Sequence, residues 1–112
     1  MLTKTLIKRR QKVGKEREVF ALIRKMRSRA MNQKGYISGE TLIDHVDPQK
    51  TLVIGTWQSI EDWQNWFENQ RRKELEDQLA DLLDGPAEFE AYVYSKYYLS
   101  VTTDFKEGDP RP

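Results

Sequence analysis

The feature that most limits the fold of this chain is the order in which its hydrophobic spacing changes. Alternating or β-branched apolar segments at residues 2–9, 36–46, 51–58 and 87–95 predict four strands. Apolar residues at spacings of three and four after Lys15 and after Ser59 predict two helices. The order strand, helix, strand, strand, helix, strand is the ferredoxin-like βαββαβ arrangement. It predicts an α+β fold, with a four-stranded antiparallel sheet and both helices on one face.

Local signals place the ends of the two helices. The first carries one apolar stripe, and Gly35 is expected to supply a left-handed residue at its end. Ser59, answered by the acidic Asp62 three residues later, predicts the start of the second helix. A polar run over residues 68–73 interrupts the second stripe and predicts a bend or break near 69–72, and the helix is expected to end at 84–86. The first stripe consists of Val19, Leu22, Ile23, Met26 and Ala30.

Both faces of the predicted sheet carry apolar side chains, although two helices can cover only one face. Strict alternation in the second strand would put Tyr36 and Leu42 on one face and Ile37 and Ile43 on the other. A bare apolar face of that size is unusual in a monomer. The pattern therefore predicts a homodimer joined through the sheet faces that lack helices.

Length and composition limit the remaining possibilities. With 112 residues the chain is one domain, expected over residues 1–101, followed by a flexible tail at 102–112. Residues 96–101 are apolar enough to extend the fourth strand toward a partner sheet. The chain has no Cys, one His, no apolar run of membrane length and no apolar secretory signal. These features predict a cytoplasmic protein with no membrane association and no metal site built within one chain.

Charge is divided unevenly along the sequence. Residues 1–34 hold twelve Lys and Arg against two Glu, a net charge of +10, whereas the whole chain has +1. Either the basic third binds nucleic acid, or an acidic second helix lies beside the basic first helix and offsets its field; the second interpretation is favoured. The basic runs at 8–12 and 71–73 lack phosphate-loop glycines, and solvated faces are the simpler interpretation.

Two groups of residues are candidates for chemistry. His45, beside the predicted Asp47-Pro48 turn, is the one side chain that titrates near neutrality unaided, so it is a weak candidate for a general base. Trp57, Trp63 and Trp66 are dense enough to line a pocket by stacking, although packing alone also explains them, Trp63 above all.

If a ligand binds, the expected site lies inside the protomer, between sheet and helices. Trp57 and Trp66 would form one wall, and Leu22 and Met26 on the first helix would close the other side. Such a pocket suits a flat, mostly apolar molecule with one or two polar edges. His45 and the tyrosines are the candidate proton acceptors, and no spacing assigns that role to one of them.

Residues 35–42, 47–48 and 53–66 resemble the antibiotic biosynthesis monooxygenase domains, and the resemblance extends over about residues 2–95. Its most specific part is the Trp-x-Ser-x-Glu-Asp junction that begins at Trp57. The resemblance implies a ferredoxin-like chain that dimerises into an α+β barrel. It also implies an oxidoreductase, a monooxygenase that acts on a small aromatic, polyketide-like compound without a cofactor. A non-catalytic small-molecule-binding or assembly module on the same fold is the alternative.

The two active subgroups of that family are matched only in part. Members that oxidise anthrones with molecular oxygen, without metal or flavin, have a Trp at the position of Trp57. They place an Asn where this chain has Val53, and a Tyr near Trp63. Haem-degrading members have a Trp at Trp66, an iron-ligating His where this chain has Glu76, and an Asn on the first strand. The missing His predicts that this chain does not degrade haem.

Overall fold

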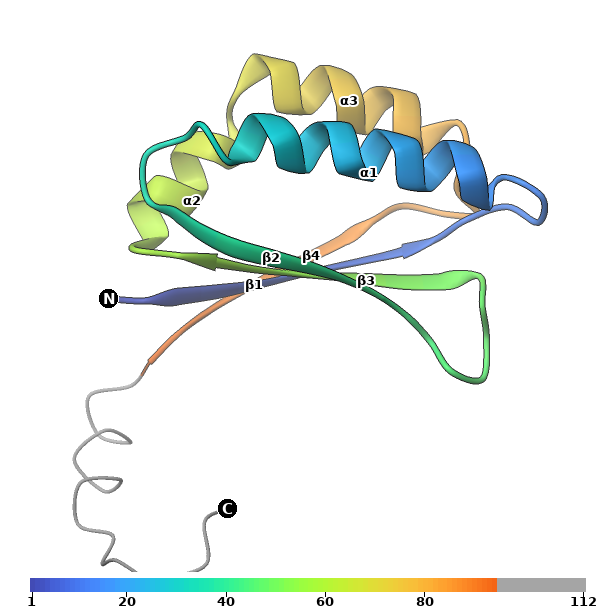
Figure 1. Ribbon diagram of the computed structural model, residues 1–112, viewed down its shortest axis with the longest axis horizontal. Coiled ribbons are helices and arrows are strands. Elements are labelled where there is room, and N and C mark those ends of the chain that lie inside the picture. Colours follow the sequence, from blue (N-terminus) through green and yellow to red (C-terminus); the bar gives the residue numbers. More distant parts are fainter. Residues whose placement is uncertain (95–112) are drawn as a thin grey trace, which may run out of the picture.

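A twisted four-stranded sheet lies beneath three helices, all of which cover the same face (Figure 1). The computed structural model describes residues 1–94, so the predicted end of the fourth strand, its extension and the tail lie outside the described residues. The elements are β1 (Thr3–Arg10), α1 (Glu16–Ala30), β2 (Tyr36–Ile43), β3 (Lys50–Trp57), α2 (Ile60–Phe67), α3 (Gln70–Ala80) and β4 (Glu88–Val93).

The sheet has the strand order β2-β3-β1-β4, and every neighbouring pair is antiparallel. The predicted α+β fold is therefore confirmed. β1 lies in the middle, where Ile7 is opposite Val53 on β3 and Phe89 on β4. Because side chains alternate along a strand, the odd-numbered residues of β1 face the helices and are buried, whereas the even-numbered residues face away.

One predicted alternation is wrong. The pairing of β2 with β3 shifts between Tyr36 and Ser38, so that Tyr36 is opposite Trp57 and Leu42 is opposite Leu52. Directly opposed residues share a face, which puts Tyr36 on the helix-covered face and Leu42 on the open face. A bulge of one residue reverses the alternation, and the sequence pattern alone gave no sign of it.

The predicted interruption of the second helix is confirmed as a complete break. Ser59 caps α2 by accepting a hydrogen bond from the Asp62 amide at 3.1 Å. Asn69 begins α3 by accepting from the amides of Arg71 and Arg72 at 2.9 and 3.2 Å. The helix ends come earlier than predicted: α3 ends at Ala80 and α1 at Ala30. Gly35 does have a positive φ of 86°, but it sits in the turn before β2 and not at the end of α1.

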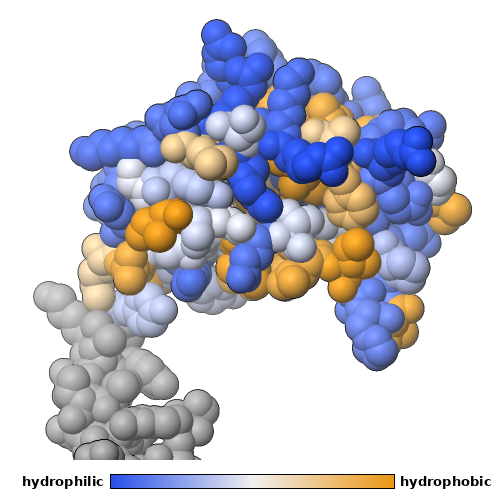
Figure 2. Space-filling view, in the orientation of Figure 1, coloured by the Kyte–Doolittle hydropathy of each residue, from blue (hydrophilic) through white to orange (hydrophobic). Residues whose placement is uncertain are grey.

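The core lies between the sheet and the helices. It is a cluster of eleven buried apolar residues: Ile7, Val19, Ile23, Met26, Ala30, Trp57, Trp63, Trp66, Leu75, Leu79 and Leu83. No helix or strand within residues 1–94 covers the opposite face of the sheet, and apolar residues lie along the lower edge of the molecule in Figure 2 while hydrophilic ones gather over the helices. No helix within residues 1–94 is long and apolar enough to cross a membrane.

Candidate functional site

A narrow crevice opens between the helices and the covered face of the sheet. Its volume is about 50 Å³. Sheet residues form its floor, α1 and α2 form its walls, and its polar contribution comes mainly from Thr5, Arg9, Arg27 and Tyr36. Four aromatic side chains line it: Tyr36, Trp57, Trp63 and Trp66.

These aromatic rings belong to a continuous series of contacts. The ring of Tyr36 meets Trp57 edge-on at 5.3 Å between centroids, and Trp57 lies 6.0 Å from Trp63. Trp63 then contacts Phe67 at 5.5 Å, and Phe67 contacts Phe89 at 5.2 Å. Edge-to-face and tilted contacts of this kind hold the rings at fixed angles, so the aromatic walls of the crevice are rigid.

Two glycines form part of the floor of the crevice and contribute no side chain to it. Gly39 on β2 and Gly55 on β3 are directly opposed in the sheet and both line the crevice. A side chain at Gly39 would begin 2.6 Å from the Tyr36 hydroxyl oxygen and 3.1 Å from Nε of Arg27. One at Gly55 would begin 2.6 Å from Oγ1 of Thr5. The space over the two strands is therefore taken by polar ends of neighbouring side chains, and neither glycine tolerates a Cβ without a shift.

A buried cluster of charges borders the crevice on the side of α3. Arg9 donates to both carboxylate oxygens of Glu76, at 2.7 and 3.2 Å, and Arg72 donates to the same carboxylate at 3.3 Å. The Arg9 side chain is 1% exposed. Arg72 also lies over the Phe67 ring, at 4.4 Å from its centroid. Burial lowers the pKa of Arg72, and the charge of Glu76 opposes that shift.

This cluster corrects the interpretation of the two basic runs as solvated faces. Arg9 and Arg72 are both buried. Alternation along β1 puts Arg9 in phase with Ile7, and helical spacing puts Arg72 in phase with Leu75 and Leu79. The spacing of both arginines indicated burial, but the basic residues beside them in the sequence suggested a solvated surface.

Most of the predicted ligand-contacting residues meet at the crevice. Trp57, Trp63, Trp66 and Met26 all line it and are at least nine-tenths buried. Leu22 is partly buried and packs against the core without lining the crevice. Arg27 and Tyr36 also line it, and sequence reasoning did not single them out. The spacing of Ile23, Arg27 and Ala30 on α1 was a signal that could have placed Arg27 on the inner side of the helix.

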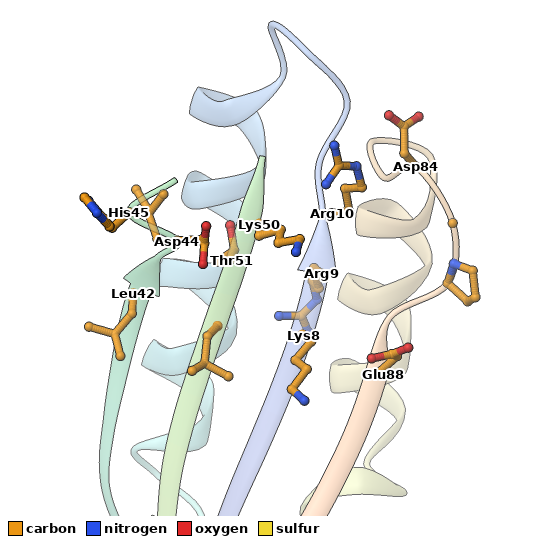
Figure 3. A pocket seen from close by; sticks show the side chains of 14 residues that line it. Lys8, Arg9, Arg10, Leu42, Asp44, His45, Lys50, Thr51, Asp84 and Glu88 are labelled. Atoms are coloured by element: carbon orange, nitrogen blue, oxygen red, sulfur yellow. The ribbon is translucent and has the colours of Figure 1, made fainter. Parts of the chain in front are cut away.

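His45 lies elsewhere. It is exposed on the β2–β3 turn, at the edge of a second and wider hollow of about 720 Å³ on the open face of the sheet (Figure 3). Lys8 and Glu88 line this open groove, and Leu42 and Leu52 contribute apolar surface. The groove is larger than the crevice, and much of its lining belongs to the face through which dimerisation is predicted.

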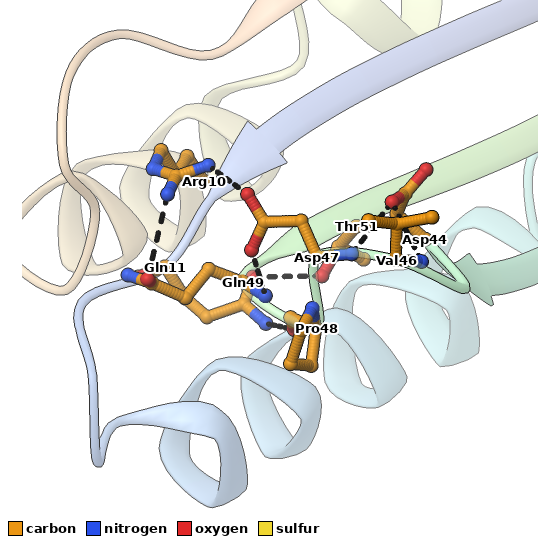
Figure 4. Close-up of polar contacts among 8 residues, drawn as sticks. All are labelled: Arg10, Gln11, Asp44, Val46, Asp47, Pro48, Gln49 and Thr51. Carbon is orange, nitrogen blue, oxygen red and sulfur yellow. Dashed lines mark hydrogen bonds and ion pairs between the residues drawn. The ribbon is translucent and has the colours of Figure 1, made fainter.

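The turn that carries His45 is fixed by polar contacts to the end of β1 (Figure 4). Arg10 donates to Asp47 at 2.6 Å, and Gln11 donates to the Pro48 carbonyl at 2.9 Å. The Gln49 side chain donates back to the Gln11 carbonyl at 2.9 Å. Hydrogen bonding to Arg10 and to the Gln49 amide holds the pKa of Asp47 below its usual value. His45 is thus held away from the crevice, and the geometry gives it no part there.

Two further properties limit the chemistry of the crevice. Burial raises the pKa of the Tyr36 phenol, with Arg27 acting in the opposite direction, so this hydroxyl is a neutral hydrogen-bond donor at pH 7. Within residues 1–94 no three acidic or His side chains come together as a metal-binding group.

No protein-family profile matches the sequence, and no curated protein matches it either. Solved structures do match its fold. A conserved protein from Methanosarcina mazei is 17% identical, with a TM-score of 0.77 over 82% of this chain and 91% of that one. A protein named antibiotic biosynthesis monooxygenase is 14% identical, with a TM-score of 0.74 over 85% of this chain and 99% of its own. SnoaB, a cofactor-independent oxygenase from Streptomyces nogalater, is 12% identical, with a TM-score of 0.72 over 86% and 96% of the two chains.

The chain therefore folds like the antibiotic biosynthesis monooxygenases. At these identities the likeness concerns the fold, and the activity has to be argued from the crevice itself.

Proposed function

We propose that this chain is a small oxygenase that binds an electron-rich hydroxylated aromatic compound in the crevice and oxidises it with molecular oxygen, without a cofactor. The observation that carries the proposal is the wall formed by Trp57, Trp63, Trp66 and Tyr36 between the helices and the sheet. SnoaB, which shares the fold, is a cofactor-independent oxygenase. Aromatic walls of this kind hold a flat substrate and keep water from it.

The reaction needs no external reductant when the substrate has an activated methylene group, as an anthrone does. The methylene carbon loses two hydrogens and gains one oxygen atom as a carbonyl, and the second oxygen atom leaves with the two hydrogens as water. The substrate supplies the electrons after it loses a proton to form an enolate, and that proton is one of the two hydrogens that leave in the water. Tyr36 fits the role of a donor to the enolate oxygen, because its phenol is neutral at pH 7.

Substrate entry requires the crevice to widen. Its 50 Å³ is well below the roughly 300–1,000 Å³ of typical ligand pockets. Met26 on α1 has a flexible, unbranched side chain and lines the crevice together with the tryptophans. We expect Met26 and the neighbouring Arg27 to move outward when a ligand binds, while the packed rings stay in place.

An oxygen electrode tests the proposal, with 1,8-dihydroxyanthrone as the substrate and a metal chelator present. The expected result is oxygen uptake above the spontaneous rate, one oxygen molecule per quinone formed. Trp66→Ala should lower both the rate and the affinity, and Trp66→Phe should restore most of both, since it keeps an aromatic wall. Uptake that is unchanged in Trp66→Ala, or absent in the wild type, would contradict an oxygenase built on this crevice.

A non-catalytic binding module is the second candidate, and one residue favours it. Val53 lines the crevice at the position where the anthrone-oxidising members, by resemblance, carry an Asn. An apolar Val offers no hydrogen bond to an intermediate. Saturable quenching of Trp fluorescence by 1,8-dihydroxyanthrone under nitrogen, together with no oxygen uptake in air, would support the binding module over the enzyme.

We also propose that the chain does not break down haem. Both carboxylate oxygens of Glu76 are engaged by Arg9 and Arg72, so the position of the iron-ligating His is occupied by an internal ion cluster. We expect haemin with a reductant to keep its Soret band when the protein is added. Rapid loss of that band with biliverdin-like products would contradict this expectation.

The open face of the sheet is the proposed interface for a second copy of the chain. Its centre is apolar, with Leu6, Leu52 and Ile54 partly buried and Leu42 and Tyr92 more than two-fifths exposed. Light scattering at micromolar concentration should give twice the chain mass of 13.3 kDa. Ile54→Lys should produce monomers, whereas Val13→Lys should leave the dimer intact, because Val13 is 78% exposed in the β1–α1 loop. A wild-type chain that runs as a stable monomer would overturn the interface.

A further inference from the structure

Two arginines line the crevice, and they differ in how their charge is balanced. Arg9 donates to both oxygens of Glu76. Arg27, on α1, is partly buried and donates through Nη2 to the neutral hydroxyl of Thr41. No carboxylate within residues 1–94 forms an ion pair with Arg27. A guanidinium that has lost part of its hydration without gaining a counter-ion is stabilised by any anion that reaches it.

The surroundings of Arg27 contain a second donor. Nε of Arg27 and the hydroxyl oxygen of Tyr36 lie 3.1 and 2.6 Å from the point where a side chain at Gly39 would begin. Two donors therefore converge over a residue that has no side chain. Glu40, next in sequence, is opposite Ile54 and so belongs to the open face of the sheet. The strand thus keeps its nearest carboxylate away from this point.

The aromatic wall begins beside this pair of donors. Tyr36 contacts Trp57 edge-on, and Trp57 continues to Trp63. A ligand with its ring against Trp57 therefore has the donors Tyr36 and Arg27 at one of its edges. An oxyanion at that edge would receive charge-assisted hydrogen bonds, whereas a neutral amide of the same shape would receive weaker ones.

We infer that Arg27 makes the crevice selective for anionic aromatic ligands, meaning a flat ring that carries a carboxylate or a phenolate at one edge. The inference rests on the proposed function in that it takes the crevice as the ligand site, and it adds the charge class of the ligand. It does not require that the ligand be oxidised.

A matched pair of probes tests the charge preference. Calorimetric titration at pH 7 compares 2-naphthoate with 2-naphthamide, which have the same rings and nearly the same shape. The wild type should bind 2-naphthoate about 10- to 100-fold more tightly, the range expected for a hydrogen bond to a charged group. Arg27→Gln should remove this preference by weakening 2-naphthoate binding far more than 2-naphthamide binding, while Arg27→Lys should keep part of it.

Arg24→Gln is the control, because it removes the same charge from an exposed position of the same helix. It should leave the preference intact. Equal weakening of 2-naphthoate binding in Arg24→Gln and Arg27→Gln would overturn the inference, since it would show only the diffuse field of a basic helix. Equal binding of both probes by the wild type, or binding of neither, would overturn it as well.

Binding of 2-naphthamide in Arg27→Gln also reports that the variant has folded. The proposed oxygenase fails separately: an Arg27-dependent preference without oxygen uptake from 1,8-dihydroxyanthrone would leave the inference standing and remove the enzyme. Oxygen uptake together with equal binding of the two probes would do the reverse.

Discussion

Three consecutive residues of β1 each pair with an acidic residue, and their surroundings differ sharply. Lys8 pairs with Glu90 on the open face, and Arg10 pairs with Asp47 beside the β2–β3 turn. Arg9, between them, points to the covered face and pairs with Glu76. The exposed fraction of the basic side chain is 50% for Lys8, 1% for Arg9 and 42% for Arg10. Burial, and not the number of ion pairs, therefore decides which of the three matters to the fold.

The physical reason is the cost of removing charge from water. An exposed pair keeps most of its hydration whether or not it forms, so forming it changes little. A buried pair has lost that hydration already, and each partner then depends on the other. Glu76 serves two guanidiniums at once, which makes it the residue whose loss leaves most charge uncompensated.

The largest expected effect is therefore that of Glu76→Gln. It leaves Arg9 and Arg72 buried without a counter-ion, and we expect a loss of about 3–5 kcal/mol in the free energy of unfolding. Urea unfolding followed by Trp fluorescence measures it. Glu74→Gln, an exposed position of the same helix, is the matched control and should change stability little. A Glu76→Gln variant as stable as that control would show that Arg9 and Arg72 find other partners.

The cluster of Arg9, Arg72 and Glu76 could not be predicted from the sequence, whereas other features could. The strands, the break between α2 and α3, and the Ser59 cap follow from local patterns, because spacing and capping residues act within a few positions of the chain. Arg9 was misplaced because a run of basic residues suggests a solvated surface, although strand alternation puts every second one inside. Its partner Glu76 is 67 residues away, and no local pattern reports a pairing across that separation.

Only part of the crevice could be predicted, because some of its residues are also brought together from distant parts of the chain. Trp57 lies at the end of a strand and Trp66 lies in a capped helix. Their positions relative to the sheet can therefore be deduced from the fold. Arg27 and Tyr36 meet over Gly39 only because β2 shifts its pairing at Tyr36. That shift turns the Tyr36 ring to the covered face, and its effect on the site depends on side chains brought together from α1 and β2.

The second expected effect belongs to the Arg10–Asp47 pair and is measured as a change in how steeply stability falls in acid. Arg10 lowers the pKa of Asp47 from its ordinary 3.8, so the folded chain binds this proton less readily than the unfolded chain. The stabilisation is thus present above about pH 3.8 and is lost as the pH falls through the lower folded value. Asp47→Asn keeps an oxygen for the Gln49 amide but loses the charge. Urea midpoints measured below pH 4 should fall less steeply in this variant, and Arg10→Gln should act likewise.

A steeper acid loss in Asp47→Asn than in the wild type would reverse the sign and contradict the role given to Arg10. The turn itself should survive the change, because the side chain of Gln11 still donates to the Pro48 carbonyl and that of Gln49 to the Gln11 carbonyl. Unchanged circular dichroism at pH 7 would confirm that only the charge was removed.

The smallest expected effect is that of the Lys8–Glu90 pair, and it depends on whether a second chain covers the open face. The hydrogen bond and charge of Glu90 raise the pKa of Lys8 above its ordinary 10.5. This contribution is present at neutral pH and is lost as the pH rises through the raised pKa of Lys8.

The test compares two backgrounds. In a monomeric Ile54→Lys background, Glu90→Gln should shift the urea midpoint too little to measure at moderate salt, because both side chains of the pair remain hydrated. In the proposed dimer of the wild type the same substitution should weaken association measurably, because the second copy would desolvate Lys8 and leave it unpaired. Equal effects in the two backgrounds would mean that the Lys8–Glu90 pair remains exposed to solvent in the wild type. The open face would then not be the interface.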